Sequence, residues 1–202
     1  MKQRIIGITG GIATGKTTVS DYLHHTYRLP ILDADLYAKQ ALNGDRLLKI
    51  SDRYGKSIFD DKGNLDRRKL GSIVFSSPSD RQWLEELIHP YVKECLISEA
   101  NRLAPSTVVM VIPLLFEAKM QDLVTETWAI ACDPQQQLQR LINRNHLSES
   151  EALQRITSQM SQAKKIELAD VAIINSDNTE EIVLQVDNAL FNSPLGIFLI
   201  KK

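Results

Sequence analysis

Residues 4–17 read RIIGITGGIATGKT, and this stretch decides which fold the chain adopts. Its apolar, β-branched start over residues 4–9 is typical of a short buried strand bounded by glycine. Three glycines follow, and a helical pattern runs from residue 16 to residue 26. Glycines between a strand and a helix let a ligand approach the backbone closely, so the stretch predicts a binding loop.

The segment from Gly10 to Thr17 fits the spacing G-x-x-x-x-G-K-[S/T], which is typical of loops that hold phosphate groups. Backbone N–H groups in such a concave loop, and the positive end of the following helix, attract a polyphosphate. Lys16 would place its charge near the β- and γ-phosphates, and Thr17 would offer a hydroxyl to Mg²⁺. The residues expected to contact ATP in this segment are Gly10, Gly11, Ala13, Thr14, Gly15, Lys16, Thr17 and Thr18.

Beyond the loop, short apolar runs alternate with helical patterns. We expect strands at residues 30–33, 107–112, 127–132 and 170–174, and helices at 34–42, 134–145, 148–162 and 179–191. This alternation favours an α/β fold with a parallel sheet and helices on both faces. Residues 45–104 contain only helical patterns and turns, and they are too many for a simple crossover. We therefore expect an inserted helical subdomain there.

Composition excludes several classes of protein. The 202 residues carry a net charge of −1, so no basic excess points to nucleic acid as a partner. No apolar run reaches the roughly 18 residues of a membrane span, and the apolar residues before the glycines are too few for the hydrophobic region of a signal peptide. We expect the apolar tail at 196–202 to be a packed or frayed end and not an anchor. Cys95 and Cys132 form no C-x-x-C motif, which predicts reduced thiols and a cytoplasmic protein.

Three classes of nucleotide-binding protein compete for this loop. A GTPase switch needs an NKxD motif, which is missing, and DRYG at 52–55 and DDKG at 60–63 follow no expected strand. A motor-type ATPase would place an aspartate at the end of the strand 107–112, which instead ends in isoleucine and proline. A small-molecule kinase is therefore favoured, with a non-catalytic nucleotide-binding module as the alternative.

An acidic pair follows the second expected strand. Because ligands bind at the carboxyl ends of parallel strands, Asp33 should face the phosphate loop, where it can accept a proton from an attacking hydroxyl. As an alternative, Asp33 caps the helix over 34–42. Asp35 could likewise be an acid favoured by the dipole in the first turn of that helix.

Basic side chains gather on two late helices. Arg140 and Arg144 are four residues apart and share a helix face, and Arg155 shares a face of the next helix with Gln159, with Lys164 just beyond. Phosphoryl transfer needs positive charge around the moving group and exclusion of water, so these helices suit a lid that closes on ATP. Solvated helix faces are the alternative.

Seven motifs together resemble one family. They are TGGIATGKTT in the loop, DAD at 33–35, LDRRKL at 65–70, HP at 89–90, PLLFE at 113–117, RLINR at 140–144 and RITSQ at 155–159. In this order they resemble dephospho-CoA kinases, from about residue 4 to about residue 190. The resemblance implies that ATP phosphorylates the ribose 3′-hydroxyl of dephospho-CoA, the last step of coenzyme A synthesis. It also implies Mg²⁺ and a monomer or weak homo-oligomer.

The family architecture is a single domain with three parts. The resemblance implies a three-layer α/β/α P-loop kinase core with a parallel sheet, a helical CoA-binding insertion and a small helical lid. In this chain the core would take residues 1–44, 105–133 and 165–202, the acceptor subdomain 45–104, and the lid 134–164.

The resemblance also implies roles for particular residues. Asp33 matches the family's base and Arg140 its lid arginine, and both would act on the reacting phosphoryl group together with Lys16. The further ATP contacts would come from Arg144 and from Asn175, which lies where the family contacts adenine. Asp35, Arg67 and His89 would bind the acceptor, although a packing role for His89 stays open.

Some positions depart from the family pattern. Ala13 and Thr14 replace the usual glycine and serine of the loop, and Ala13 must adopt a backbone angle suited to alanine. Val111 stands where many members have an aspartate, and Asp177 stands where a glycine is common. None of these changes removes a charge that the chemistry requires.

Overall fold

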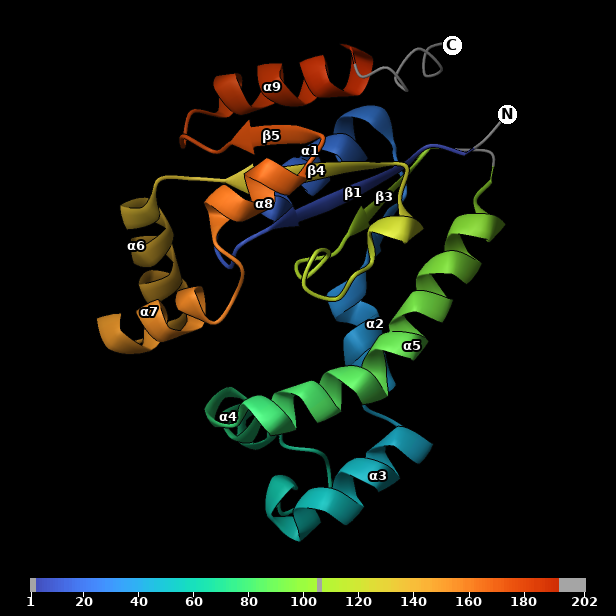
Figure 1. Cartoon of the computed structure of the whole chain (residues 1–202), viewed down its shortest axis with the longest axis vertical. Coiled ribbons are helices and arrows are strands. Elements are labelled where there is room, and N and C mark those ends of the chain that lie inside the picture. The colour runs from blue at the N-terminus through green and yellow to red at the C-terminus, as the bar shows by residue number, and fades with distance from the viewer. Residues whose placement is uncertain (1–2, 105–106, 193–202) are drawn as a thin grey trace. The chain divides into compact units, whose positions relative to one another are not determined.

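Five parallel strands form one sheet in the computed structural model, which describes residues 3–104 and 107–192 (Figure 1). The strands are β1 (Ile5–Gly10), β2 (Ile31–Asp33), β3 (Val108–Val111), β4 (Glu126–Ala131) and β5 (Val171–Ile174). Their order across the sheet is β2-β3-β1-β4-β5, and every neighbouring pair is parallel. The predicted parallel sheet is confirmed, and β1 at its centre leads into the glycine loop.

The helices follow the expected order. They are α1 (Lys16–Tyr27), α2 (Ala34–Ala41), α3 (Asp45–Tyr54), α4 (Arg67–Ser76), α5 (Pro78–Arg102), α6 (Pro134–Asn145), α7 (Glu149–Thr157), α8 (Gln162–Leu168) and α9 (Thr179–Asn192), with 3₁₀ turns η1 (Gly55–Ile58) and η2 (Gln121–Leu123). The capping aspartate of α6, Asp133, accepts hydrogen bonds from the backbone N–H groups of Gln135 and Gln136. Short local patterns therefore determine these helix starts.

One expected helix is wrong in its second half. The helix over 148–162 does begin with a capping box of Ser148 and Glu151, but it ends at Thr157, and a separate helix α8 begins at Gln162. The side chain of Ser161 accepts a hydrogen bond from the backbone N–H of Lys164 and caps α8. Serine favours helix caps over helix interiors because its hydroxyl competes for backbone groups, so this serine starts a new helix.

The main core lies on the α1 side of the sheet. Side chains of a strand point alternately to opposite faces. Ile6 and Ile8 therefore share a face, where they pack with Trp128 and with apolar residues of α1 and α9. On the opposite face α8 packs against β4 and β1, as Figure 1 shows. The central strands are buried almost throughout, as expected of a parallel sheet covered on both faces.

A second compact unit comprises residues 35–95. Its own small core contains Ile50, Ile58 and Leu70, and half-buried aromatic side chains such as Trp83 pack around it. Residues 45–104, which the structure describes without a gap, contain helices and a single isolated bridge between Phe59 and Leu65, but no strand, as expected. The unit begins inside α2 and ends inside the continuous helix α5.

The expectations about cysteines, membrane spans and the C-terminal tail concern the chain as a whole. Cys95 and Cys132 are both free thiols. In the part of the chain that the structure describes, no helix is both long and apolar enough to cross a membrane. The apolar tail at 196–202 lies outside the described residues.

Candidate active site

The glycines of the loop between β1 and α1 are required by their surroundings. Gly10 has φ +153° and Gly15 has φ +99°, both in the region that favours glycine. A Cβ atom at Gly10 would lie 2.4 Å from the carbonyl oxygen of Ile130, and one at Gly15 would lie 1.9 Å from Nδ2 of Asn175. A larger residue at Gly10 would therefore force backbone to move, and one at Gly15 would displace the side chain of Asn175 and adopt a strained φ.

The two substituted loop positions differ in how they fit the loop. Ala13 adopts the left-handed conformation with φ +62°, which alanine occupies less readily than glycine. Thr14 is fully buried, and its hydroxyl donates a hydrogen bond of 2.9 Å to the carbonyl oxygen of Gly11. The side chain of Thr14 thus adds a hydrogen bond within the loop.

The lysine of the loop folds back over it. Nζ of Lys16 donates hydrogen bonds to the carbonyl oxygens of Gly10 at 3.0 Å and of Gly11 at 2.8 Å. The ammonium group therefore lies beside the loop that is expected to hold the phosphates. Its neighbours on the first turn of α1, Thr17 and Thr18, are exposed.

The exposed hydroxyl of Thr17 suits a magnesium ion. Mg²⁺ takes oxygen ligands, keeps several waters and is commonly held through substrate phosphates and only one or two protein groups. Within residues 3–104 and 107–192, no cluster of three or more His, Cys, Asp or Glu side chains could hold a metal by itself. One hydroxyl at a phosphate loop fits an ion that arrives with a triphosphate.

Asp33 lies at the same edge of the sheet as the loop. In the strand register, Asp33 pairs with Val111 and Val111 pairs with Ile8, two residues before the end of β1. Two strand spacings, about 10 Å, therefore separate the backbone of Asp33 from β1. Asp33 is half-buried and directly precedes α2, a position that suits both a base and a helix cap.

The structure brings Asn175 into contact with the phosphate loop, and Arg140 lies beside Asn175. Asn175 is buried, and its Nδ2 donates a hydrogen bond of 3.0 Å to the carbonyl oxygen of Thr14. Arg140 forms an ion pair with Asp177, and its Nη2 lies 3.5 Å from Oδ1 of Asn175. Asp177 has φ +65°, which explains why glycine suits that position. Arg140 is thus held beside the loop by residues that follow β5.

The other basic residues of the late helices differ in placement. Arg144 is exposed and bonds to the side chain of its neighbour Asn145. The expected helix face shared by Arg155 and Gln159 is wrong, because α7 ends at Thr157. Gln159 instead accepts a hydrogen bond of 2.8 Å from the backbone N–H of Ile12 in the loop.

The three residues expected to bind the acceptor belong to the second unit. Asp35 lies in the first turn of α2 and Arg67 is the first residue of α4, and both are exposed. His89 is half-buried on α5. Burial lowers the pKa of His89, and Lys93 acts in the same direction against the opposing effect of Glu85. The imidazole is therefore largely neutral at pH 7.

One buried lysine of α8 was not singled out from the sequence. Lys165 is 1% exposed, and its Nζ donates to Oε2 of Glu117 at 2.9 Å and to the carbonyl oxygen of Pro113 at 2.8 Å. Burial lowers the pKa of Lys165, and Glu117 partly opposes this shift. The neighbouring lysine noted in the sequence, Lys164, is exposed and pairs with Glu167. Because the sequence did not reveal that a new helix, α8, begins at Gln162, it gave no sign that Lys165 faces the core.

Comparisons with known proteins place the chain in a family. Residues 4–181 match the family model described as dephospho-CoA kinase. A dephospho-CoA kinase of Synechocystis sp. is 52% identical over 191 residues, which cover 93% of this chain and 95% of the relative. A crystal structure from Thermus thermophilus has a TM-score of 0.84 at 31% identity and covers 97% of this chain and 100% of its own. Dephospho-CoA kinase from Campylobacter jejuni has a TM-score of 0.65 at 26% identity, with 91% and 96% covered.

Proposed function

The chain belongs to the dephospho-CoA kinase family, as its motifs suggested, and from this membership we propose how its residues carry out the reaction. The enzyme transfers the γ-phosphoryl group of ATP to dephospho-CoA in coenzyme A biosynthesis. The ribose 3′-hydroxyl oxygen attacks the γ-phosphorus, and the bond from this phosphorus to the bridging oxygen of the β-phosphate breaks. The hydroxyl proton passes to the carboxylate of Asp33, and CoA and ADP leave.

One observation carries this proposal. The loop with its required glycines ends β1, and Asp33 ends β2 at the same edge of the parallel sheet. A phosphate site and an acid at strand ends two spacings apart on one edge of the sheet suit a transfer between two bound molecules, because each element holds one partner of the reaction.

Positive charge around the phosphates comes from the lysine of the loop and from two arginines of α6. Lys16 leaves the carbonyl oxygens of Gly10 and Gly11 and contacts the β- and γ-phosphates instead. Arg140 exchanges its ion pair with Asp177 for the charge that builds on the transferred group, and Arg144 adds charge at the rim. The helices α6 and α7, within residues 134–164, close as a lid and exclude water.

The remaining nucleotide contacts come from the loop and from Asn175 beside the adenine. Backbone N–H groups over residues 10–18 and the N-terminus of α1 hold the phosphates. Thr17 would hold Mg²⁺ together with phosphate oxygens. When bound there, the ion neutralises charge on the β- and γ-phosphate oxygens.

The acceptor binds through Asp35 on α2 and through the helical residues 45–104, where Arg67 and His89 are the contacts. Arg67 is an exposed cation at the start of α4 and suits a phosphate of dephospho-CoA. The largely neutral imidazole of His89 suits a hydrogen bond more than an ion pair.

The cellular location, the oligomeric state and the partners of the protein are also part of the proposal. The free thiols of Cys95 and Cys132 suit the cytoplasm, where thiols stay reduced. We expect a monomer or a weak homo-oligomer, and light scattering at several concentrations measures this directly. No nucleic acid is expected as a partner, because the net charge is −1.

The decisive experiment is a coupled assay of ADP release with several acceptors. Dephospho-CoA should support release, whereas adenosine, shikimate and nucleoside monophosphates should not. The product should co-migrate with CoA, which carries the new phosphate on the 3′-oxygen. Preference for a nucleoside monophosphate would favour another small-molecule kinase. ATP binding without release for any acceptor would favour a non-catalytic module.

A further inference from the structure

Both backbone groups of one residue at the tip of the phosphate loop are held by side chains from outside the loop. The N–H of Ile12 donates a hydrogen bond of 2.8 Å to Oε1 of Gln159, and the carbonyl oxygen of Ile12 accepts one of 2.8 Å from Nε2 of Gln137. The peptide groups on either side of Ile12 are therefore fixed in orientation.

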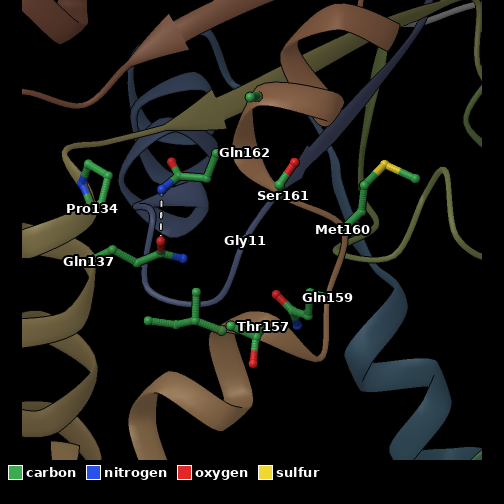
Figure 2. A pocket seen from close by; sticks show the side chains of 10 residues that line it. Gly11, Pro134, Gln137, Thr157, Gln159, Met160, Ser161 and Gln162 are labelled. Atoms are coloured by element: carbon green, nitrogen blue, oxygen red, sulfur yellow. Dashed lines mark hydrogen bonds between the residues drawn. The ribbon is translucent and has the colours of Figure 1, made fainter.

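The contact continues through a third glutamine to the sheet. Oε1 of Gln137 accepts a hydrogen bond of 2.7 Å from Nε2 of Gln162, which Figure 2 shows as a dashed line. Oε1 of Gln162 in turn accepts one of 2.7 Å from the N–H of Cys132, just past the end of β4. We call Gln137, Gln159 and Gln162 the glutamine clamp. It links the loop to the sheet through amide groups whose donors and acceptors are matched.

The clamp residues come from both ends of the segment expected to form the lid. Gln137 lies near the start of α6, whereas Gln159 and Gln162 lie where the chain returns from α7 to α8. The N–H of Met160 also donates to Oε1 of Glu117 at 3.1 Å, which anchors the return segment independently. Both chain connections of this segment thus contact the same loop residue.

A cavity of about 450 Å³ borders the clamp. Its lining includes Gly11, Gln137, Gln159 and Gln162, and Figure 2 shows these residues around the loop. Gln137 is 3% exposed, so its amide is shielded from water on its other sides. Directed hydrogen bonds thus hold the loop at the edge of this cavity.

We propose that the glutamine clamp positions the phosphate loop for ATP, so that Gln137 and Gln159 are positioning residues of the phosphoryl transfer. This inference rests on the proposed function. The peptide at Ile12 precedes Ala13, whose left-handed conformation turns the chain into the phosphate-facing part of the loop. Fixing Ile12 therefore fixes the direction of the N–H groups that follow, and preorganised donors bind an anion more tightly than mobile ones.

Matched variants test the clamp through steady-state kinetics. Gln137→Met and Gln159→Leu keep the side-chain size but remove the amides, and Gln139→Met and Gln154→Leu make similar changes at exposed positions of α6 and α7. The clamp variants should raise KM for ATP about tenfold, the effect of losing one or two buried hydrogen bonds, and leave KM for dephospho-CoA unchanged. The control variants should match the wild type.

Hydrogen exchange provides a readout that needs no acceptor. The Ile12 amide should exchange about tenfold faster in Gln159→Leu, because its acceptor is gone. Gln159→Glu keeps an acceptor oxygen at the same place and should restore slow exchange. A structural role would instead shift exchange across the sheet as well.

The clamp is overturned if KM for ATP in both clamp variants equals that of the controls, or if KM for both substrates rises together with a lower melting temperature. Unchanged exchange at Ile12 in Gln159→Leu would overturn it too. If the wild type releases no ADP with dephospho-CoA, the proposed function fails instead, while the exchange comparison still decides whether Gln159 orders the loop.

Discussion

Different neighbours explain why particular residue types occupy the phosphate loop. Gly10 and Gly15 are required by the close approach of Ile130 and Asn175, whereas Lys16 makes its contacts with the loop through its charge. Its ammonium group lies on two carbonyl oxygens, which are weaker partners than a triphosphate. Under the proposed function, Lys16 exchanges these contacts for phosphate oxygens when ATP binds.

Replacing Lys16 with alanine tests this charge. Lys16→Ala should lower kcat/KM by at least about 100-fold, because it removes the cation that the loop itself supplies to the β- and γ-phosphates. ADP release with dephospho-CoA measures the loss. The matched control is Lys164→Ala, an exposed lysine that pairs with Glu167, and its activity should equal that of the wild type.

Asp33 carries the acid–base proposal. Asp33→Asn should keep ATP binding, measured by calorimetry, and lower kcat by roughly 10²- to 10⁴-fold, because the amide cannot take up the hydroxyl proton. Asparagine remains a good helix cap, so the start of α2 should persist. Unchanged turnover would show that Asp33 serves only as a cap.

The elements of the fold meet through a few long-range polar contacts. Lys165 on α8 reaches Glu117 and Pro113, which follow β3, and thereby ties a helix on one face of the sheet to the end of its strands. A buried charge of this kind is stable only while it is paired. This pair therefore helps to determine where the chain that returns from α7 attaches to the core.

Removing only Glu117 from the pair should destabilise the protein more than removing both partners. Glu117→Leu leaves the ammonium of Lys165 buried and unpaired and should cost about 2 kcal/mol of unfolding free energy, below the value for fully buried pairs because Glu117 is 24% exposed. Lys165→Met in the same chain should recover much of the loss. Urea unfolding measures both, and loss of the exposed Lys164–Glu167 pair should cost less than about 1 kcal/mol.

The contact between α1 and α9 predicts a pH dependence. The hydroxyls of Tyr22 and Tyr27 both donate to Oδ1 of Asp187, and burial, the largest cause, raises the pKa of both phenols. The folded state thus keeps protons that the unfolded state loses above its ordinary tyrosine pKa of about 10. The stabilisation is complete below that pH and is lost as the pH rises further.

Urea unfolding between about pH 8 and pH 11 measures this loss. The double variant Tyr22→Phe/Tyr27→Phe should show a smaller fall in unfolding free energy over the alkaline part of the range. An equal fall in variant and wild type would mean that other groups cause it.

At the scale of the whole molecule, ligands should stabilise the native state by mass action. A ligand at 100 times its Kd adds about 2.7 kcal/mol, which for a chain of this size raises Tm by about 5–10 °C. ATP with Mg²⁺ and dephospho-CoA should each produce a shift. Adding EDTA should reduce the shift with ATP and leave that with dephospho-CoA unchanged, and an equal shift without the metal would contradict the role given to Thr17.

Much of the fold follows from patterns within short windows. The strand before the loop and the helix starts near residues 134 and 148 were predicted correctly, because each depends on residues a few positions apart. The break at Ser158–Ser161 was not, because a serine can lie in a helix or cap one, and the tertiary contacts of Gln159 and Gln162 favour the second choice.

The amino-acid sequence by itself determined the phosphate loop, the alternation of strands and helices, the parallel sheet and the family, since these depend on local spacing and on the order of motifs. Only the tertiary structure decided which distant side chains meet. Gln159 is 147 residues from Ile12, Lys165 is 48 from Glu117 and Arg140 is 37 from Asp177. Periodicity carries no information about such pairs, because the packing of helices on a sheet brings them together only after the chain has folded.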